Sequence, residues 1–421
     1  MKLRLDDLHI YTGDGWVDGC IAVVDGVVVS VGEAPGDLSF DTVSCGGMTA
    51  FPGFADVHVH LREPGFSYKE TIASGTAAAA RGGYTAVCAM PNLDPVPDSP
   101  EHLAAELAAI DRGAVIAVHP YGAITVGEKG RTMADVEGLA SSVVAFSDDG
   151  KGVQNGAMME QAMRRVKAAG KLIAAHCEDE SLLRGGCVHD GVYAAEHGLP
   201  GICSESEWGP IARDVILAEK TGCPYHVCHV STKESVRIIR EAQARGADVT
   251  CETAPHYLVF CDEQLQDDGR FRMNPPIRSR EDRDALRQGL KDGTIGIIAT
   301  DHAPHSAEEK SRGLAGSANG IVGLETAFPV LYTELVKTGV ISLEQLLEKL
   351  IANPRARFGL GGGTIRAGER ADFTVFDLNE SYAIDPAEFL SMGRSSPFSG
   401  MTVCGRCRMT VFGDHIVWRE P

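Results

Sequence analysis

Long apolar runs and an excess of basic residues are both missing from this sequence of 421 residues. No uninterrupted apolar stretch reaches the length of a membrane-spanning helix, and the opening residues MKLRLDDLHIYTGDGW hold no apolar segment of the kind that directs secretion. The 39 Lys and Arg residues against 58 Asp and Glu residues give a net charge of −19, which repels phosphate backbones and anionic lipid surfaces. We therefore expect a cytoplasmic protein that binds neither nucleic acid nor membrane.

Aromatic residues are few, at 6%, but 44% hydrophobic and 23% charged residues are typical of an ordinary globular chain. This composition excludes disordered, collagenous and fibrous coiled-coil proteins. Twelve cysteines run from Cys20 to Cys407, and without a secretory leader we interpret them as reduced thiols, many of them buried like small hydrophobic residues. An acidic small molecule is still allowed as a substrate, because an arginine or a metal ion can reverse the sign of the charge inside a pocket.

The two ends of the chain have the pattern of β-structure, unlike its middle. In the segment IAVVDGVVVSVG the pair Asp25-Gly26 separates two valine-rich runs and predicts a β-hairpin. Near the other end, the runs ADFTVFDL, GMTVCGRCRMTVFG and DHIVWRE are rich in β-branched and aromatic residues. We predict one small β-rich domain from residues 1–50 and 356–421, and a larger α/β domain from residues 51–355.

Short apolar runs alternate with helix-like segments throughout the middle of the chain. The runs are FADVHVH, YTAVCAM, AVIAVHPYG, SVVAFSD, KLIAAH, PYHVCH, DVTCETA and TIGIIAT. Eight strands alternating with capped helices predict a (β/α)8 TIM-like barrel, and a doubly wound open sheet is the alternative. The Gly-, Ser- and Ala-rich segment 306–320 follows the eighth run, and we expect it to close over bound substrate.

Histidine and aspartate residues stand at the ends of the predicted strands. His58 and His60 close the first run, and their two-residue spacing turns both imidazoles to one face. Later runs are followed by Asp148, Asp149, His176, His229, Asp301 and His302. A barrel gathers the carboxyl ends of its strands at one rim, so these groups should converge there. Imidazole and carboxylate donors together suit zinc, with manganese or cobalt as substitutes, and ordinary hydrogen-bonded histidines are the alternative.

Several motifs resemble those of a known family. The strings DVHVHLREPG and KETIASGTAAAARGGYTAVCAMPN, and later HCED, HVST, MNPP and ATDHAPH, are similar to motifs of the amidohydrolase superfamily and, within it, of the bacterial type I dihydroorotases. The similarity runs through the whole predicted barrel. The β-rich ends match the family's small β-sandwich domain, which is assembled from both termini. The resemblance implies a metal-dependent cyclic amidohydrolase that interconverts dihydroorotate and N-carbamoyl-L-aspartate in pyrimidine biosynthesis.

The resemblance also implies two sets of metal ligands that would share Asp149. They are His58, His60 and Asp301 for one zinc ion, and His176 and His229 for a second. Many relatives in the superfamily use a carboxylated lysine at the fourth-strand position, where this sequence has Asp148-Asp149 and, shortly after, Lys151. The number of metal ions at the site, one or two, is therefore left open, and two are favoured.

Hydrolysis of a cyclic amide needs a strong nucleophile, a polarised carbonyl and a proton for the departing nitrogen. A bound divalent ion lowers the pKa of its water to about 7 and polarises the carbonyl. By resemblance, Asp301 would shuttle the proton from this activated hydroxide to the leaving nitrogen. The residues alone leave a second interpretation open, in which Asp301 is a ligand only.

A binding site for the substrate carboxylate is predicted beside the metal ligands. Arg62 lies two residues beyond His60, and a guanidinium can hold a carboxylate through two parallel hydrogen bonds. Asn92, at the end of the second run, could join it. By resemblance, the remaining substrate contacts would come from His60, Asn274 and His305, and from the backbone of Asn319 and Gly320. We interpret the other histidines, His226 among them, as structural or exposed, and His256 stays ambiguous.

Two other functions compete with this interpretation. A relative acting on hydantoin, allantoin or another cyclic ureide would keep the metal ligands, but Arg62 argues against it because those substrates lack the same carboxylate arrangement. A non-catalytic partner of aspartate carbamoyltransferase should have lost metal ligands, and none is missing here. The catalytic enzyme could still bind that transferase, and we expect it to be a homodimer.

Overall fold

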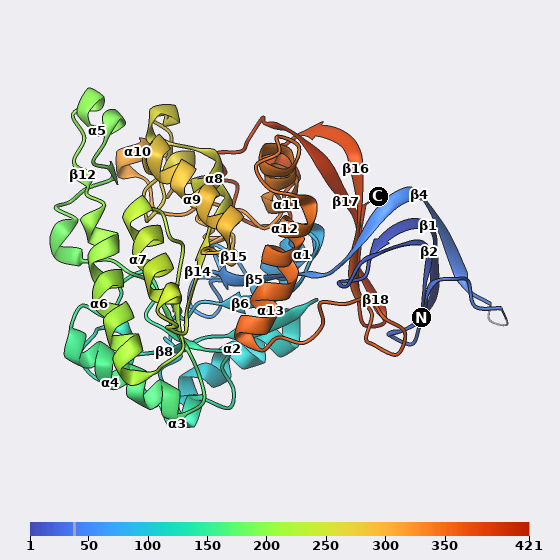
Figure 1. Ribbon diagram of the computed structural model, residues 1–421, viewed down its shortest axis with the longest axis horizontal. Coiled ribbons are helices and arrows are strands. Elements are labelled where there is room, and N and C mark those ends of the chain that lie inside the picture. The colour runs from blue at the N-terminus through green and yellow to red at the C-terminus, as the bar shows by residue number, and fades with distance from the viewer. Residues whose placement is uncertain (37–38, 421) are drawn as a thin grey trace.

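The computed structural model describes residues 1–36 and 39–420, and Figure 1 shows a helix-ringed barrel with a curved sheet beside it. The barrel strands are β5 (Phe54–Val59), β6 (Tyr84–Ala89), β7 (Ala117–Pro120), β8 (Gly122–Ala123), β9 (Phe146–Ser147), β10 (Ile173–Ala175), β13 (Tyr225–Val227), β14 (Val249–Thr253) and β15 (Ile297–Ile298). Only Tyr121 separates β7 from β8, so these two are halves of the third strand. Each of the eight predicted runs therefore carries one strand.

Backbone contacts close these strands into a ring. β5, β6 and β7 form one parallel sheet, and β8, β9, β10, β13, β14 and β15 form another. Beyond β15, His302 pairs with Val59 in a parallel bridge, and the His60 N–H donates to the His302 carbonyl at 2.8 Å. The predicted barrel is confirmed, and the open-sheet alternative is wrong.

Helices cover the outside of the barrel (Figure 1). The longer ones are α1 (Ile72–Arg81), α2 (Pro100–Gly113), α4 (Gly156–Ala168), α6 (Glu205–Thr221), α7 (Lys233–Ala244) and α9 (Arg280–Asp292). Shorter ones are α3 (Val136–Leu139), α5 (Val192–His197), α8 (Pro255–Val259), α10 (Gly313–Gly316), α11 (Ala327–Leu331), α12 (Leu343–Leu347) and α13 (Asn353–Phe358). The side chains of Thr71, Ser99, Thr232 and Ser279 each accept a hydrogen bond from a first-turn backbone N–H, as expected of helix caps.

Strands from both ends of the chain form one seven-stranded mixed sheet. Its order is β18 (His415–Arg419), β17 (Thr402–Phe412), β16 (Asp372–Ala383), β4 (Asp41–Pro52), β1 (Lys2–Tyr11), β2 (Trp16–Val24) and β3 (Val27–Gly32). Asp25 and Gly26 have φ of 47° and 80°, which a two-residue hairpin turn requires, and they join β2 to β3 as predicted. Leu5, Ile21 and Phe373 belong to one buried cluster drawn from both halves of the sheet. The sheet thus packs over its own core, as the predicted β-sandwich does.

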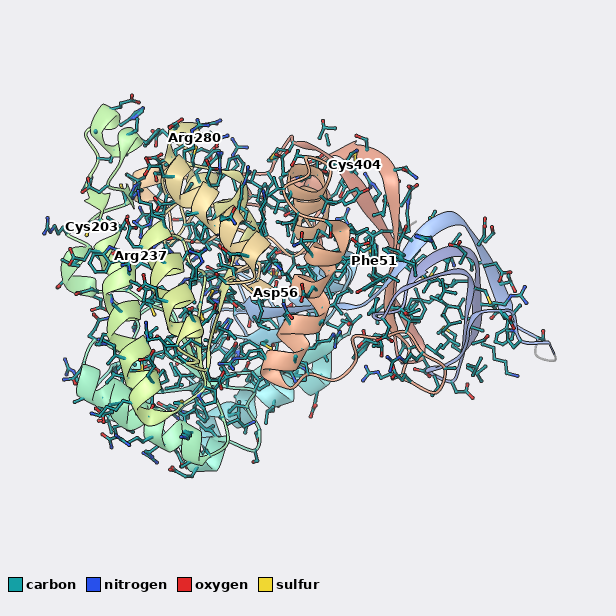
Figure 2. All side chains as sticks on the ribbon, in the orientation of Figure 1. Phe51, Asp56, Cys203, Arg237, Arg280 and Cys404 are labelled. Atoms are coloured by element: carbon teal, nitrogen blue, oxygen red, sulfur yellow. The ribbon has the colours of Figure 1, made fainter. Side chains whose placement is uncertain are left out.

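An aromatic junction joins this sheet to the barrel. Phe51, near the end of β4, is labelled in Figure 2. It packs on Phe54, Phe328 and Phe376 with ring centroids 6.2, 5.6 and 5.9 Å away. The domain boundaries drawn at residues 50/51 and 355/356 stay a prediction. Among the described residues, no helix has the length and apolar character needed to cross a membrane. The twelve cysteines are free thiols, and most of them are buried.

Candidate active site

Six histidine and aspartate side chains meet at the carboxyl end of the barrel. They are His58 in β5, His60 directly after β5, Asp149 after β9, His176 after β10, His229 after β13 and Asp301 after β15. All six are buried. The backbone at His229 and Asp301 has positive φ values of 34° and 48°, which are uncommon for these residue types. Such local strain persists where the surrounding fold fixes the position of a functional side chain.

Two imidazoles and two carboxylates form the first group. The Nε2 of His58 lies 3.4 Å from Asp149 Oδ1 and 3.5 Å from Asp301 Oδ1. The Nε2 of His60 lies 3.1 Å from Asp301 Oδ1 and 3.6 Å from Asp149 Oδ2. Each of these imidazoles therefore lies within 3.6 Å of both carboxylates. His58, His60 and Asp149 are close enough to one another to hold a single cation.

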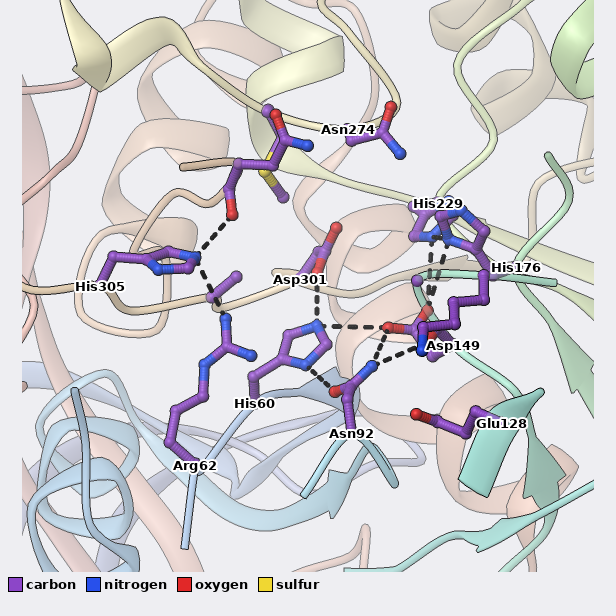
Figure 3. Close-up of a pocket in the computed structure, with 15 residues that line it drawn as sticks. His60, Arg62, Asn92, Glu128, Asp149, His176, His229, Asn274, Asp301 and His305 are labelled. Carbon is purple, nitrogen blue, oxygen red and sulfur yellow. Dashed lines mark hydrogen bonds and ion pairs between the residues drawn. The ribbon is translucent and has the colours of Figure 1, made fainter. Parts of the chain in front are cut away.

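A second group shares Asp149 with the first. Asp149 Oδ1 lies 3.6 Å from His176 Nδ1 and 3.7 Å from His229 Nε2, and the two imidazole nitrogens are 2.9 Å apart (Figure 3). Asp149 is thus within reach of cations in both groups. Asp148 points elsewhere, because its carboxylate accepts hydrogen bonds from the N–H groups of Ile124 and Thr125 at 2.8 and 3.0 Å.

The donors at this centre fit a divalent metal ion. His58 Nε2 and Asp149 Oδ1 are buried and have no hydrogen-bond partner among the described residues. Buried polar atoms are nearly always paired, so two unpaired atoms that face each other need a further partner. Imidazole nitrogens and carboxylate oxygens are the ligands that zinc accepts in catalytic sites. The residues present therefore fit a metal ion.

Charge at the centre also favours a cation. Burial lowers the pKa of His58, but Asp301 and Asp149 outweigh this effect and hold the pKa well above its usual value. Burial raises the pKa of the Asp149 carboxyl, but the nearby imidazoles of His58, His176 and His229 outweigh this effect and hold that pKa well below its usual range. Burial also raises the pKa of the Asp301 carboxyl, but His58, His60 and His229 outweigh this effect and lower that pKa. Both carboxylates are thus stabilised in the ionised form, which is the form that binds metal.

A buried carboxylate behind the centre orients His58. Glu252, on β14, lies with Oε1 2.7 Å from His58 Nδ1 and Oε2 3.1 Å from His226 Nε2. A proton on His58 Nδ1 leaves Nε2 free to face the two aspartates. Glu252 was not predicted from the sequence. A glutamate inside the apolar run DVTCETA was nevertheless a usable signal, because an unpaired buried charge there would be costly.

A cavity of about 280 Å³ opens beside these groups (Figure 3). Its lining contains His60, Arg62, Asn92, Glu128, Asp149, Gly150, Lys151, His176, His229, Met273, Asn274, Asp301, Ala303, His305 and Asn319. Most of the residues predicted for substrate binding therefore share one pocket. Glu128, Gly150, Met273 and Ala303 line it without having been predicted.

Arg62 and Asn92 approach the centre from the first two strands. The Arg62 guanidinium lies 3.3 Å from the Pro304 carbonyl and 3.4 Å from His305 Nε2. Asn92 lies with Oδ1 2.6 Å from His60 Nδ1 and donates through Nδ2 to the Asp149 carboxylate at 3.0 Å. Asn92 therefore links His60 to Asp149, and Arg62 places a guanidinium in the lining of the pocket.

The remaining predicted substrate contacts, Asn274, Asn319 and Gly320, each form hydrogen bonds with neighbouring segments. Asn274 lines the pocket and donates to Glu178 at 2.9 Å, and the Asn319 carbonyl lies 2.7 Å from His305 Nε2. Gly320 follows the pocket residue Asn319; its N–H donates to the Arg272 carbonyl, and its own carbonyl accepts from Lys310. A Cβ at Gly320 would lie 2.2 Å from the Ala303 carbonyl, so the glycine is required by close backbone packing.

The chain is similar to curated dihydroorotases over nearly its whole length. A family model described as "Dihydro-orotase-like" matches residues 47–235. The dihydroorotase of Bacillus cytotoxicus is 49% identical over 402 residues, which are 95% of this chain and 94% of the relative. That of Geobacillus kaustophilus is 52% identical over 382 residues, or 90% of this chain and 89% of the relative.

Solved structures with the same fold include enzymes of other names. The L-hydantoinase (dihydropyrimidinase) of Arthrobacter aurescens has a TM-score of 0.87 at 26% identity and covers 99% of this chain and 96% of its own. The dihydropyrimidinase of Brevibacillus agri has a TM-score of 0.86 at 24% identity, with coverages of 100% and 95%. The architecture is thus that of a known group of barrel enzymes.

Proposed function

Because this chain belongs to the dihydroorotase family, we propose that it catalyses the reversible hydrolysis of dihydroorotate to N-carbamoyl-L-aspartate. The observation that carries the proposal is the pairing of Arg62 with the His and Asp centre in one pocket. Such a pocket suits a cyclic amide that bears a carboxylate, because the guanidinium can hold the carboxylate while the amide faces the centre. Hydantoin and allantoin lack the same carboxylate arrangement.

The proposed cofactor is zinc, with two ions per chain. One ion would be held by His58, His60 and Asp301 and the other by His176 and His229, with Asp149 between them. Zinc bound there would supply a lowered pKa for a coordinated water and polarisation of the amide carbonyl. The distances among these side chains, and the unpaired buried atoms of His58 and Asp149, support the assignment.

The remaining chemistry belongs to residues of the chain. Asp301 would accept the proton of the attacking water and deliver it to the departing ring nitrogen, so that one carboxylate acts as base and then as acid. Arg62 would hold the substrate carboxylate, aided by Asn274, by His305 and by the Asn319 backbone. Asn92 would fix His60 and Asp149 through the hydrogen bonds described above.

The cellular setting is proposed on the same basis. A biosynthetic enzyme with a small-molecule substrate and free thiols suits the cytoplasm. We further propose a homodimer, and aspartate carbamoyltransferase as a possible partner, from the family resemblance alone.

A substrate panel tests the proposed function. The purified protein is incubated with dihydroorotate, hydantoin and allantoin, and ring opening of dihydroorotate is followed by loss of its ultraviolet absorbance. Turnover of dihydroorotate alone is expected. Turnover of hydantoin or allantoin in its place would assign the chain to another cyclic ureide. Absence of any turnover by folded, zinc-loaded protein would favour a non-catalytic partner.

A further inference from the structure

One carboxyl group in the pocket takes no part in the chemistry proposed so far. Three acidic residues line the cavity: Glu128, Asp149 and Asp301. Both aspartates belong to groups that converge as metal ligands, and within the described part of the chain none of those groups includes Glu128. Glu128 follows the third barrel strand and lies on the same side of the pocket as Asp149 and Asn92 (Figure 3).

The backbone holds Glu128 in an unusual conformation. Gly127 and Glu128 have positive φ values of 60° and 53°, a region that a glutamate rarely adopts. The Gly127 N–H donates to the Asp98 carboxylate at 2.8 Å, and the Glu128 N–H donates to the Thr125 carbonyl at 3.0 Å. Thr125 is itself bound by Asp148. These hydrogen bonds fix the turn that directs the glutamate into the pocket.

Burial of the Glu128 side chain in the pocket is energetically unfavourable. Only 5% of the residue is exposed, and its Oε1 has no hydrogen-bond partner among the described residues. Burial, with Asp148 and Asp149 nearby, raises the pKa of its carboxyl well above the usual range. An unpaired buried acid on a strained backbone destabilises the free protein, so its presence in the pocket points to a ligand that pairs with it.

The proposed substrate carries groups that complement this carboxyl. The ureide of dihydroorotate has two N–H donors, whereas Arg62 and Lys151, which line the same pocket, can only donate. A carboxyl oxygen accepts a hydrogen bond in both its neutral and its ionised form. We propose that Glu128 binds the substrate by accepting a hydrogen bond from a ureide N–H, an inference that rests on the proposed function. Glu128 would then orient the ring opposite the carboxylate held by Arg62.

The test compares the full-length, zinc-loaded enzyme with three variants. Glu128→Ala removes the acceptor, and Glu128→Gln keeps an oxygen of similar reach. Glu106→Gln is the matched control, because Glu106 is also buried with an unpaired carboxylate oxygen but lies on α2, outside the pocket. We expect the KM for dihydroorotate to rise about tenfold in Glu128→Ala and less than about threefold in Glu128→Gln, with no change in Glu106→Gln. Melting temperature and zinc content show that each variant is folded and loaded.

Two N-methylated analogues distinguish a direct contact from a general disturbance. Inhibition constants are measured for dihydroorotate methylated at either ring nitrogen. For one of the two analogues, the loss of affinity caused by Glu128→Ala should disappear, because the methyl group has already removed the donor. An unchanged KM in Glu128→Ala, or an equal loss for all three ligands, would overturn the inference in an active enzyme. If the wild-type enzyme does not turn over dihydroorotate at all, the proposed function fails, and the inference about Glu128 fails with it.

Discussion

Glu252 Oε1 lies 2.7 Å from His58 Nδ1, and both side chains are buried beneath the candidate metal centre. The second oxygen of this carboxylate lies 3.1 Å from His226 Nε2. Burial raises the pKa of Glu252, but His226 and His58 outweigh it and lower the pKa to about 2. Glu252 is therefore an ionised group that fixes which nitrogen of His58 carries a proton, and hence which nitrogen is free for a metal.

Replacing Glu252 should weaken metal binding without removing a ligand. In Glu252→Gln we expect the affinity for zinc to fall about 10- to 100-fold, as happens when the hydrogen-bond partner of a ligating histidine is lost. Zinc retained after dialysis against a competing chelator measures the effect. Glu196→Gln, at an exposed position on α5, is the control. Equal zinc retention in the wild type and Glu252→Gln would show that His58 needs no such partner.

Arg62 should determine selectivity for a substrate that carries a carboxylate. We expect Arg62→Lys to raise the KM for dihydroorotate about 10- to 100-fold, because lysine cannot form two parallel hydrogen bonds to a carboxylate. Steady-state kinetics measure the change, and Arg131→Lys at an exposed position serves as the control. A KM that does not respond to Arg62→Lys would contradict the assigned contact.

A buried ion pair ties the last barrel helix to the sheet, and it should matter for stability. The Arg355 Nη2 lies 3.3 Å from Asp372 Oδ2 and donates to the Gly53 carbonyl at 2.9 Å. Arg355→Met leaves the Asp372 charge buried and unpaired, which should lower the free energy of unfolding by about 3–5 kcal/mol.

Urea denaturation measures this loss, with a surface pair as the control. Arg366 and Asp14 also form an ion pair, but their side chains are 52% and 60% exposed. Arg366→Met should therefore change the free energy of unfolding by less than about 1 kcal/mol. Similar losses of unfolding free energy in the two variants would contradict the expected effect of burial on the ion pair of Arg355.

Glu106 should make stability depend on pH. Burial raises the pKa of its carboxyl well above the ordinary value of 4.5, at which the unfolded chain releases the proton. As the pH rises above that value, only the unfolded state gains by ionising, so the folded protein loses stability. Glu106→Gln should therefore be more stable than the wild type at about pH 7 and equally stable at about pH 4. Unfolding curves at both pH values measure the difference, and a constant difference would contradict the assigned cause.

The barrel and most of the metal-binding groups could be predicted from the sequence, because their signals are local. Each strand is a short apolar run, and residues such as His176 and Asp301 follow such runs directly. Because the carboxyl ends of all barrel strands meet at one rim, residues that follow separate runs in the sequence come together there. The alternation of side chains along a strand is enough to predict that His58 and His60 point to the same face.

The rest depends on contacts between distant segments that no local pattern encodes. Glu252 gains its role from His58 and His226, which lie on other strands. Glu128 enters the pocket through the left-handed backbone of Gly127 and Glu128, which the sequence does not specify. Gly320 stays a predicted substrate contact, and its backbone hydrogen bonds to Arg272 and Lys310 come from segments that no local pattern brings together.

A zinc titration with turnover measured on the same samples tests the central claim most directly. Metal-free enzyme is prepared with a chelator, zinc is added in steps, and the rate of dihydroorotate ring opening is recorded against the zinc content per chain. Without zinc we expect no turnover, and then a rate that rises until two ions are bound to the ligands that share Asp149. Full turnover by metal-free, folded enzyme would contradict the assignment of this His and Asp centre as the catalytic site.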